Sequence, residues 1–400
     1  MKSVTAISYE LDDIATATKE LTSQIKNKFT LCKNTFAILH GQPDMEIGSL
    51  ASALSRELGC RVMGGTTAAG AVLTSDGYHE LAVVLHVMSD DNCLFAAAIS
   101  GSMEDCPQKK VSETYQAAYR SLKDQDPAAE PDLVICITSI MQNCSSDANV
   151  ADLSNACGDL PIFGYNAADD FEFQKQQIFL DDEIGKHRMA ILLISSNVKP
   201  IFQVENLSGK RTLDKRLVTK SRDNIICEID GKPAYEYIKE FPFIDDKTKA
   251  LFNYQFFVEK SDSDDDDGIP VSRALNTYDI ESGEVMCFAN VPQGSYIGLR
   301  YCDGKDVADT SEAALREFMN KLKSSGSEYE YSTVLIATCS LRNMFLADEK
   351  DKEGNLVKEL LPPHLTVSGL HAFGEIAPTS IRNKKAINRF HNATFTMCAF

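Results

Sequence analysis

The chain has 400 residues, 44% of them hydrophobic and 24% charged, a composition typical of a globular protein with a sizeable core. Acidic residues outnumber basic ones by 58 to 40, and the net charge of −18 argues against nucleic acid or anionic membrane partners. No apolar run is long enough to span a membrane and no apolar signal segment stands at the N-terminus, so we expect a cytoplasmic protein without membrane insertion.

The predicted elements, in chain order, form a unit that occurs three times. A β-rich run at 35–40 leads to an apolar face of helical period over 47–58 and then to a glycine-centred turn. The turns read GTTAAGAV, GYNAADDF and GLHAFGEI, and begin at Gly65, Gly164 and Gly369. β-rich runs precede the other two turns, at 132–138 and 332–338, and an apolar strand that opens on a histidine follows each turn. The sequence therefore predicts a repeated strand–helix–strand–turn–strand unit.

Two further strands follow the first two copies, at 93–100 and 199–207, and we expect these copies to form one domain, 1–210. The polar run at 206–222 predicts a boundary. The second domain, 222–400, would contain additional strands and helices and the third copy at 332–400. The predicted fold class is α+β, with two domains of mixed β-sheets flanked by helices.

The twelve cysteines are interpreted as reduced thiols. Cys136 in LVICIT and Cys398 in TMCAF lie within apolar runs, where cysteine behaves as a small buried side chain. That usage fits a reducing cytoplasm. No CxxC pair is present, which argues against a structural zinc site.

Hydrogen-bonding side chains follow the repeated glycines and gather in the third copy. Loops at strand ends are common places for binding sites. The candidates in the first two copies are Thr66, Thr67, Tyr165 and Asn166. The third copy supplies Arg342, His371, Glu375, His391, Asn392 and Thr394. If the copies fold alike, these residues meet at one end of a sheet.

This cluster predicts a site for an amino acid or another small zwitterion. The Arg342 fork would bind a carboxylate or phosphate, and Glu375 would take an ammonium group. Histidine and asparagine would orient the ligand. The alternative is a buried polar network, with Arg342 paired to Glu375 and His391 capping a strand, and the residues alone favour neither.

The segments CSLRNMF, GLHAFGEI and RFHNATFTMCAF resemble the C-terminal half of the FIST family of sensory domains. VMGGTTAAGAV is similar to the turn in the N-terminal half of that family, although Ala71 stands where an acidic residue is usual, which argues against a cation there. The motifs come in the family's order and span nearly the whole chain. The resemblance implies a bacterial small-ligand sensor that acts with a histidine kinase, a chemotaxis receptor or a cyclic-nucleotide signalling protein.

We therefore expect a non-enzymatic sensor without a cofactor, and two alternatives stay open. The first, which the resemblance also implies, is a nitric-oxide sensor that binds haem b through His371 or His391 and regulates a histidine kinase. The second is an enzyme with Cys339 as nucleophile and one of the same histidines as base. No GxSxG, P-loop, GxGxxG or HExxH motif supports an enzyme.

Overall fold

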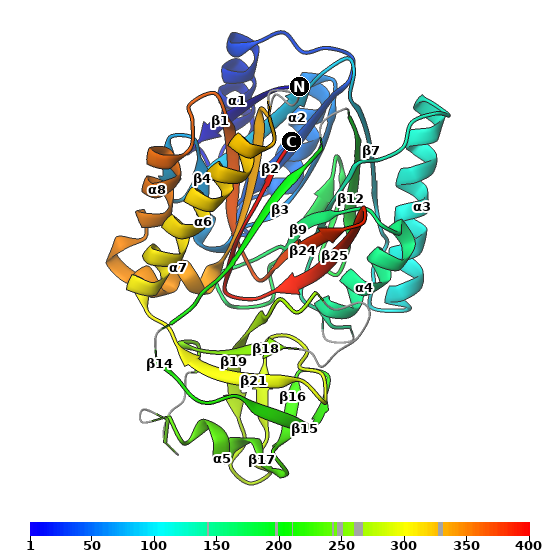
Figure 1. Cartoon of the computed structure of the whole chain (residues 1–400). Coiled ribbons are helices and arrows are strands. Elements are labelled where there is room, and N and C mark those ends of the chain that lie inside the picture. Colours follow the sequence, from blue (N-terminus) through cyan, green and yellow to red (C-terminus); the bar gives the residue numbers. More distant parts are fainter. Residues whose placement is uncertain are drawn as a thin grey trace.

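The protein is described by a computed structural model that covers residues 1–141, 144–196, 199–209, 211–241, 244–245, 251–259, 267–326 and 331–400. Over these residues the fold is α+β, as predicted. Three six-stranded mixed sheets form one unit, which we call the body, and an eight-stranded antiparallel sheet forms a second unit below it in Figure 1.

Three copies of the predicted unit build the body. The first is β2 (Thr35–Gly41), α2 (Ile47–Leu58) and β3 (Arg61–Thr66), the second β8 (Leu133–Thr138), α4 (Ser146–Cys157) and β9 (Ile162–Asn166). The third is β22 (Thr333–Cys339), α7 (Ser340–Leu346), α8 (Lys352–Leu360) and β23 (Thr366–Ala372). Within each copy the two strands pair in parallel. The connection between them includes a helix and is long enough for a parallel crossover.

A hairpin follows the second strand of each copy and joins the sheet of a different copy. The hairpins are β4 (Val72–Thr74) with β5 (Gly77–His79), β10 (Ile178–Leu180) with β11 (Glu183–Gly185), and β24 (Glu375–Arg382) with β25 (Lys385–His391). Phe179 of β10 pairs with Gly64, Glu375 of β24 with Tyr165, and Leu73 of β4 with Gly369. The three copies are therefore interlocked in a cycle.

The last strand of each copy returns beside the first strand, antiparallel to it. These strands are β6 (Val83–Ser89), β12 (Ala190–Ser195) and β26 (Thr394–Ala399). The histidines that were predicted to open these strands lie before them in two copies. His79 ends β5 and His391 ends β25. Outer strands complete the sheets: β1 (Lys2–Ser8), β7 (Leu94–Ile99) and β13 (Ile201–Asn206).

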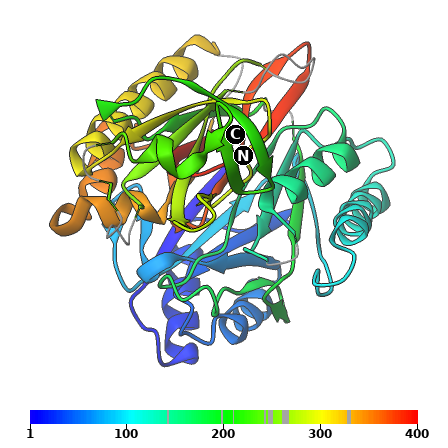
Figure 2. The same ribbon diagram turned by 90° about the horizontal axis from the view of Figure 1, so that it is seen from below.

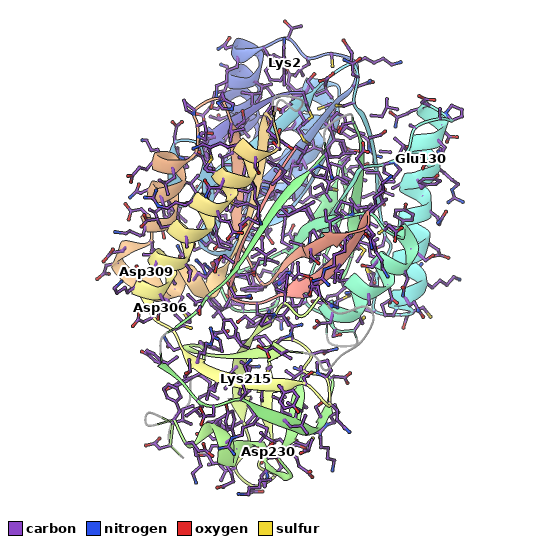
Figure 3. All side chains as sticks on the ribbon, viewed as in Figure 1. Lys2, Glu130, Lys215, Asp230, Asp306 and Asp309 are labelled. Carbon is purple, nitrogen blue, oxygen red and sulfur yellow. The ribbon has the colours of Figure 1, made fainter. Side chains whose placement is uncertain are left out.

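Helices cover the outside of the body. The longest are α1 (Ile14–Lys28), α3 (Pro107–Gln125) and α6 (Gly304–Ser324), which contact β1, β7 and β13 respectively. Figure 2 shows the helices around the rim of the body and the two chain ends close together. Charged side chains such as Lys2, Glu130 and Asp309 point into solvent (Figure 3). None of the helices described is long and apolar enough to cross a membrane.

The second unit is a barrel inserted between β13 and α6. It contains β14 (Arg211–Thr212), β15 (Arg216–Arg222), β16 (Ile225–Ile229), β17 (Lys232–Pro233), α5 (Ala234–Ile238), β18 (Tyr254–Glu259), β19 (Val271–Tyr278), β20 (Val285–Cys287) and β21 (Tyr296–Tyr301). Pairing of β21 with both β15 and β18 closes the sheet. A cluster of buried residues between Val218 and Leu299 fills its interior.

The sheets group the chain differently from the predicted halves 1–210 and 222–400. The boundary predicted at 206–222 marks the entry into the barrel, but the chain returns to the body at α6. The third copy, 332–400, then shares sheets with both earlier copies. Local patterns cannot reveal this grouping, because the hairpin exchange pairs residues hundreds of positions apart.

The repeated glycines allow close approach of neighbouring strands. A Cβ atom on Gly164 would lie 1.9 Å from the carbonyl oxygen of Cys136, so any side chain there would push β8 and β9 apart. Five residues after the third repeated glycine, Gly374 has a φ of 118°, which side-chain-bearing residues rarely adopt. Glycine at these positions is therefore required by the fold.

Candidate functional site

Arg342, predicted to hold an anionic ligand, is enclosed in an ion pair. Its side chain is fully buried, and Nε donates to Oε1 of Glu353 in α8 at 3.0 Å. Nη2 donates to the hydroxyl groups of Ser311 at 2.7 Å and Thr310 at 3.2 Å, both in α6. The predicted pairing with Glu375 is therefore wrong. The guanidinium group instead joins α6, α7 and α8. This pairing could not be predicted from local patterns, because Glu353 lies in a different helix.

Glu375, predicted to take an ammonium group, is a fully buried carboxyl at the start of β24. Its Oε2 accepts hydrogen bonds from the backbone N–H and the hydroxyl group of Thr394. Burial raises the pKa of Glu375 to about 8, so the carboxyl is largely protonated at neutral pH. A neutral carboxyl cannot form the predicted ion pair with an ammonium group.

The two candidate histidines are buried and neutral. Nδ1 of His371 donates to the carbonyl oxygen of Ala71 at 3.5 Å, and Nε2 of His391 donates to that of Ala377 at 3.1 Å. Burial lowers the pKa of both imidazoles, that of His391 to about 4. Each histidine therefore contributes to the packing between strands in its neutral form.

Three candidates in the first two copies bond to the protein itself. The hydroxyl group of Thr67 accepts the backbone N–H of His371 at 3.0 Å and so connects the first and third copies. The hydroxyl group of Thr66 accepts a backbone N–H from the residue before β10 at 3.1 Å. The phenol of Tyr165 lies 3.1 Å from Nδ1 of His40. These contacts are those of a polar network that holds the repeats together.

A cavity of about 690 Å³ lies between the body and the barrel. The body contributes the first turn of α4, the end of β9, the start of α7 and the turn after β23, and the barrel contributes β19 and the segment after β20. Asn166 and Asn392 are the predicted site residues on its wall. The volume is in the range of small-molecule sites, and a boundary between units is a common place for one.

Three asparagine amides on the wall leave hydrogen-bonding capacity unused. The Oδ1 atoms of Asn166, Asn290 and Asn392 have no partner among the described residues. Their Nδ2 atoms are held by the protein: Asn166 donates to Ser146 at 2.8 Å, and Asn290 to Ser145 at 3.0 Å. The side chains of Asn166 and Asn290 are therefore held in place, and the three amide oxygens are buried acceptors without a described partner.

The rest of the wall combines phenylalanine rings with small, aliphatic and polar side chains and carries little charge. Phe171, Phe173 and Phe373 of the body contact one another, with ring centroids 4.8–6.5 Å apart. Phe288 of the barrel lies 6.5 Å from Phe173. Of the described residues on the wall, Asp223 alone carries a formal charge. The cavity therefore matches a ligand that is partly apolar and does not depend on an arginine or lysine partner.

A buried arginine of the barrel forms an ion pair and a hydrogen bond with the body beside the cavity. Arg273 of β19 is 4% exposed, and its Nη2 donates to Oδ1 of Asp147 in α4 at 2.7 Å. Nη1 donates to the carbonyl oxygen of Phe390 at 3.0 Å, and Nε to that of Asn290 at 2.8 Å. One guanidinium group thus joins β19 to two segments of the body. A change in how the two units sit would disturb these bonds.

Comparison with known proteins identifies the family. A model described as the FIST N domain matches residues 35–232, and one described as the FIST C domain matches residues 234–378. The chain belongs to the FIST family. FIST domains are sensory domains for small ligands in signal transduction. The boundary between the two matches falls inside the barrel, between β17 and α5.

Other comparisons add little about this FIST protein. No curated protein matches it. A solved structure of cyanuric acid hydrolase from A. caulinodans is similar over 100% of this chain and 98% of its own, with 7% sequence identity and a TM-score of 0.38. Likeness at that level carries no argument about fold or activity.

The family resemblance also raised haem, with His371 or His391 as the axial ligand. Neither His371 nor His391 lines the cavity, and one ring nitrogen of each already bonds to a backbone carbonyl. The described part of the wall contains no histidine at all. A haem in this cavity could not be held by either predicted axial ligand.

Proposed function

We propose that this FIST protein is a non-enzymatic sensor whose small polar ligand binds in the cavity between body and barrel. The observation that carries the proposal is the set of buried, unpartnered amide oxygens of Asn166, Asn290 and Asn392. Two of these side chains are almost fully buried, and leaving a buried acceptor unpaired costs about 1–3 kcal/mol. A ligand whose entry moves these side chains enough to bring its donors to the buried oxygens recovers that free energy.

Amino acids and related amines are the ligand class we propose. An ammonium or amide group supplies the N–H donors, and an apolar side chain packs against the phenylalanines. The cavity differs from the predicted site, because it uses amides where the prediction used Arg342 and Glu375. Of the ten predicted residues, Asn166 and Asn392 belong to this proposal.

The position of the cavity suggests how binding is signalled. Because both units form its wall, a ligand that contacts both binds one relative arrangement more tightly and shifts the population towards it. A partner that reads this arrangement completes the sensor, and we propose a histidine kinase, a chemotaxis receptor or a cyclic-nucleotide signalling protein of the bacterial cytoplasm. All twelve cysteines are free thiols, which supports that location.

Replacement of Asn392 by alanine tests the proposal. The Asn392 amide makes one weak contact, from Nδ2 to the carbonyl oxygen of His391 at 3.2 Å, so Asn392→Ala should fold normally. We expect amino acids or amines that raise the melting temperature of the wild type to lose most of that effect in the variant. Asn355→Ala, on the exposed face of α8, is the matched control and should keep it. Equal stabilisation of wild type and Asn392→Ala would place the ligand elsewhere.

The enzymatic and haem alternatives have direct tests. Burial raises the pKa of the Cys339 thiol far above its usual range, and such a thiol is a poor nucleophile. We expect slow, non-stoichiometric alkylation of Cys339 by iodoacetamide, and rapid stoichiometric labelling would favour an enzyme. We also propose that no haem is bound. When haemin is added to the protein, its Soret band should therefore not shift as it would on binding to a specific site.

A further inference from the structure

The loop between β9 and β10 is built around one buried carboxylate. Asp169 is fully buried, and its two oxygens accept the backbone N–H groups of Phe173, Gln174 and Lys175 at 3.0, 2.8 and 2.8 Å. Three charge-assisted hydrogen bonds fix the path of this loop. The loop therefore has a defined shape, and the side chains that it exposes are held in place.

Two aromatic residues of this loop combine a strained backbone with exposed side chains. Phe171 and Phe173 have φ angles of 63° and 57°, in a backbone region that bulky residues rarely adopt, and they are 38% and 41% exposed. Backbone strain and exposed aromatic surface each cost free energy and persist where the surrounding structure enforces them, commonly at binding sites. Both rings belong to the wall of the cavity, so a binding role explains both features.

The barrel presents an aromatic ring to the same space. The ring planes of Phe173 and Phe288 are inclined by only 26°, with centroids 6.5 Å apart. A flat group laid against both would contact the body and the barrel together. Asn166, Asn290 and Asn392 line the same cavity, and their buried Oδ1 atoms have no partner among the described residues.

We propose that the ligand is an aromatic amine, with its ring against Phe173 and Phe288 and its ammonium N–H groups on the asparagine oxygens. This deepens the proposed function and rests on it. A quaternary ammonium would suit aromatic rings but has no N–H to satisfy the amides. An aromatic acid without an amine would bring a carboxylate and no ammonium N–H to a wall on which Asp223 is the one formal charge among the described residues. The net charge of −18 also attracts cations.

Four probes test the ligand class: tryptamine, hexylamine, choline and indole-3-propionate. Because the chain contains no tryptophan, the fluorescence of the indole probes can be followed without an indole background from the protein, and calorimetry serves for all four. We expect tryptamine to bind most tightly, about tenfold or more above each of the others. Phe173→Leu and Phe288→Leu should weaken tryptamine about three- to tenfold and leave hexylamine within about twofold. Tyr296→Leu, on an exposed ring of β21, is the control and should change nothing.

The outcomes separate this inference from the proposed function. If hexylamine or choline binds as tightly as tryptamine, or if Phe173→Leu weakens tryptamine and hexylamine equally, the aromatic assignment is overturned. Should hexylamine still lose affinity in Asn392→Ala, the cavity remains the site and only the ligand class is wrong. Absence of binding by all four probes overturns the inference as well. The proposed function is then tested separately by the melting-temperature comparison of the wild type and Asn392→Ala with amino acids and amines.

Discussion

Glu375 carries a carboxyl group whose ionisation is governed by its surroundings. Burial raises its pKa to about 8, while the hydrogen bonds from Thr394 and the charge of Arg342 lower it by less. One carboxyl oxygen, Oε1, has no described partner. The sequence shows a glutamate after a glycine and cannot show this environment, because Thr394 lies 19 residues away in the next strand but one. The charge that the sequence predicts at this position is therefore largely absent at neutral pH.

Replacement of Glu375 by glutamine should remove a pH dependence of stability. The folded-state pKa of Glu375 lies above its ordinary value of 4.5, so the folded protein holds a proton that the unfolded chain releases. Stability from this group is present below pH 4.5 and is lost as pH rises to about 8, by roughly 1 kcal/mol per pH unit. Urea unfolding should show the wild type losing stability relative to Glu375→Gln between pH 5 and 8. Parallel profiles would contradict this, and Glu359→Gln on exposed α8 serves as control.

At the scale of elements, the repeated units could be predicted and their partners could not. The runs at 35–40, 132–138 and 332–338 are strands as expected, because apolar β-rich stretches and glycine turns are local signals. The hairpin exchange and the Arg342–Glu353 pair depend on which elements pack together. The cavity is a further case, since Asn290 and Phe288 lie in no repeat and carried no signal in the sequence. Asn166 and Asn392 carried a signal in the sequence because they lie at strand ends.

Breaking the ion pair between α7 and α8 on one side should destabilise the fold without affecting ligand binding. Arg342→Ala leaves Glu353, which is 1% exposed, without its ionic partner, and we expect a loss of roughly 3–5 kcal/mol in the free energy of unfolding. The double variant Arg342→Met with Glu353→Leu should recover most of that loss, because neither charge is then buried alone. Urea unfolding measures both. Arg316→Ala, which breaks an exposed pair with Glu312, should cost under about 1 kcal/mol. Lower ligand affinity of the folded double variant would show that this network reaches the cavity.

On the scale of the whole molecule, an interlocked body carries a separately built barrel. The core of the barrel consists of residues from 213 to 301, whereas the larger clusters of the body draw almost entirely on the body's own sheets and helices. The segment that enters the barrel and the segment that leaves it run side by side, since a Cβ atom on Gly209 would lie 1.7 Å from the carbonyl oxygen of Tyr301. Ligand contacts at the junction then act between two units that each have a core of their own. This arrangement suits a sensor, because the relative position of the units can change without unfolding either.

Removal of the barrel should therefore leave a folded body without a ligand site. We predict that a chain in which a short Gly/Ser linker replaces residues 210–301 keeps a circular dichroism spectrum of mixed α and β structure and unfolds cooperatively. Asp147 would lose Arg273, but the surface around it becomes open to water, which limits the cost. Tryptamine and amino acids should no longer raise its melting temperature, because Phe288 and Asn290 are gone. A full-length chain with the same linker inserted at 210 is the control and should retain both folding and binding. A non-cooperative or aggregated shortened chain would mean that the barrel is needed to complete the body, and undiminished ligand stabilisation would move the site into the body alone.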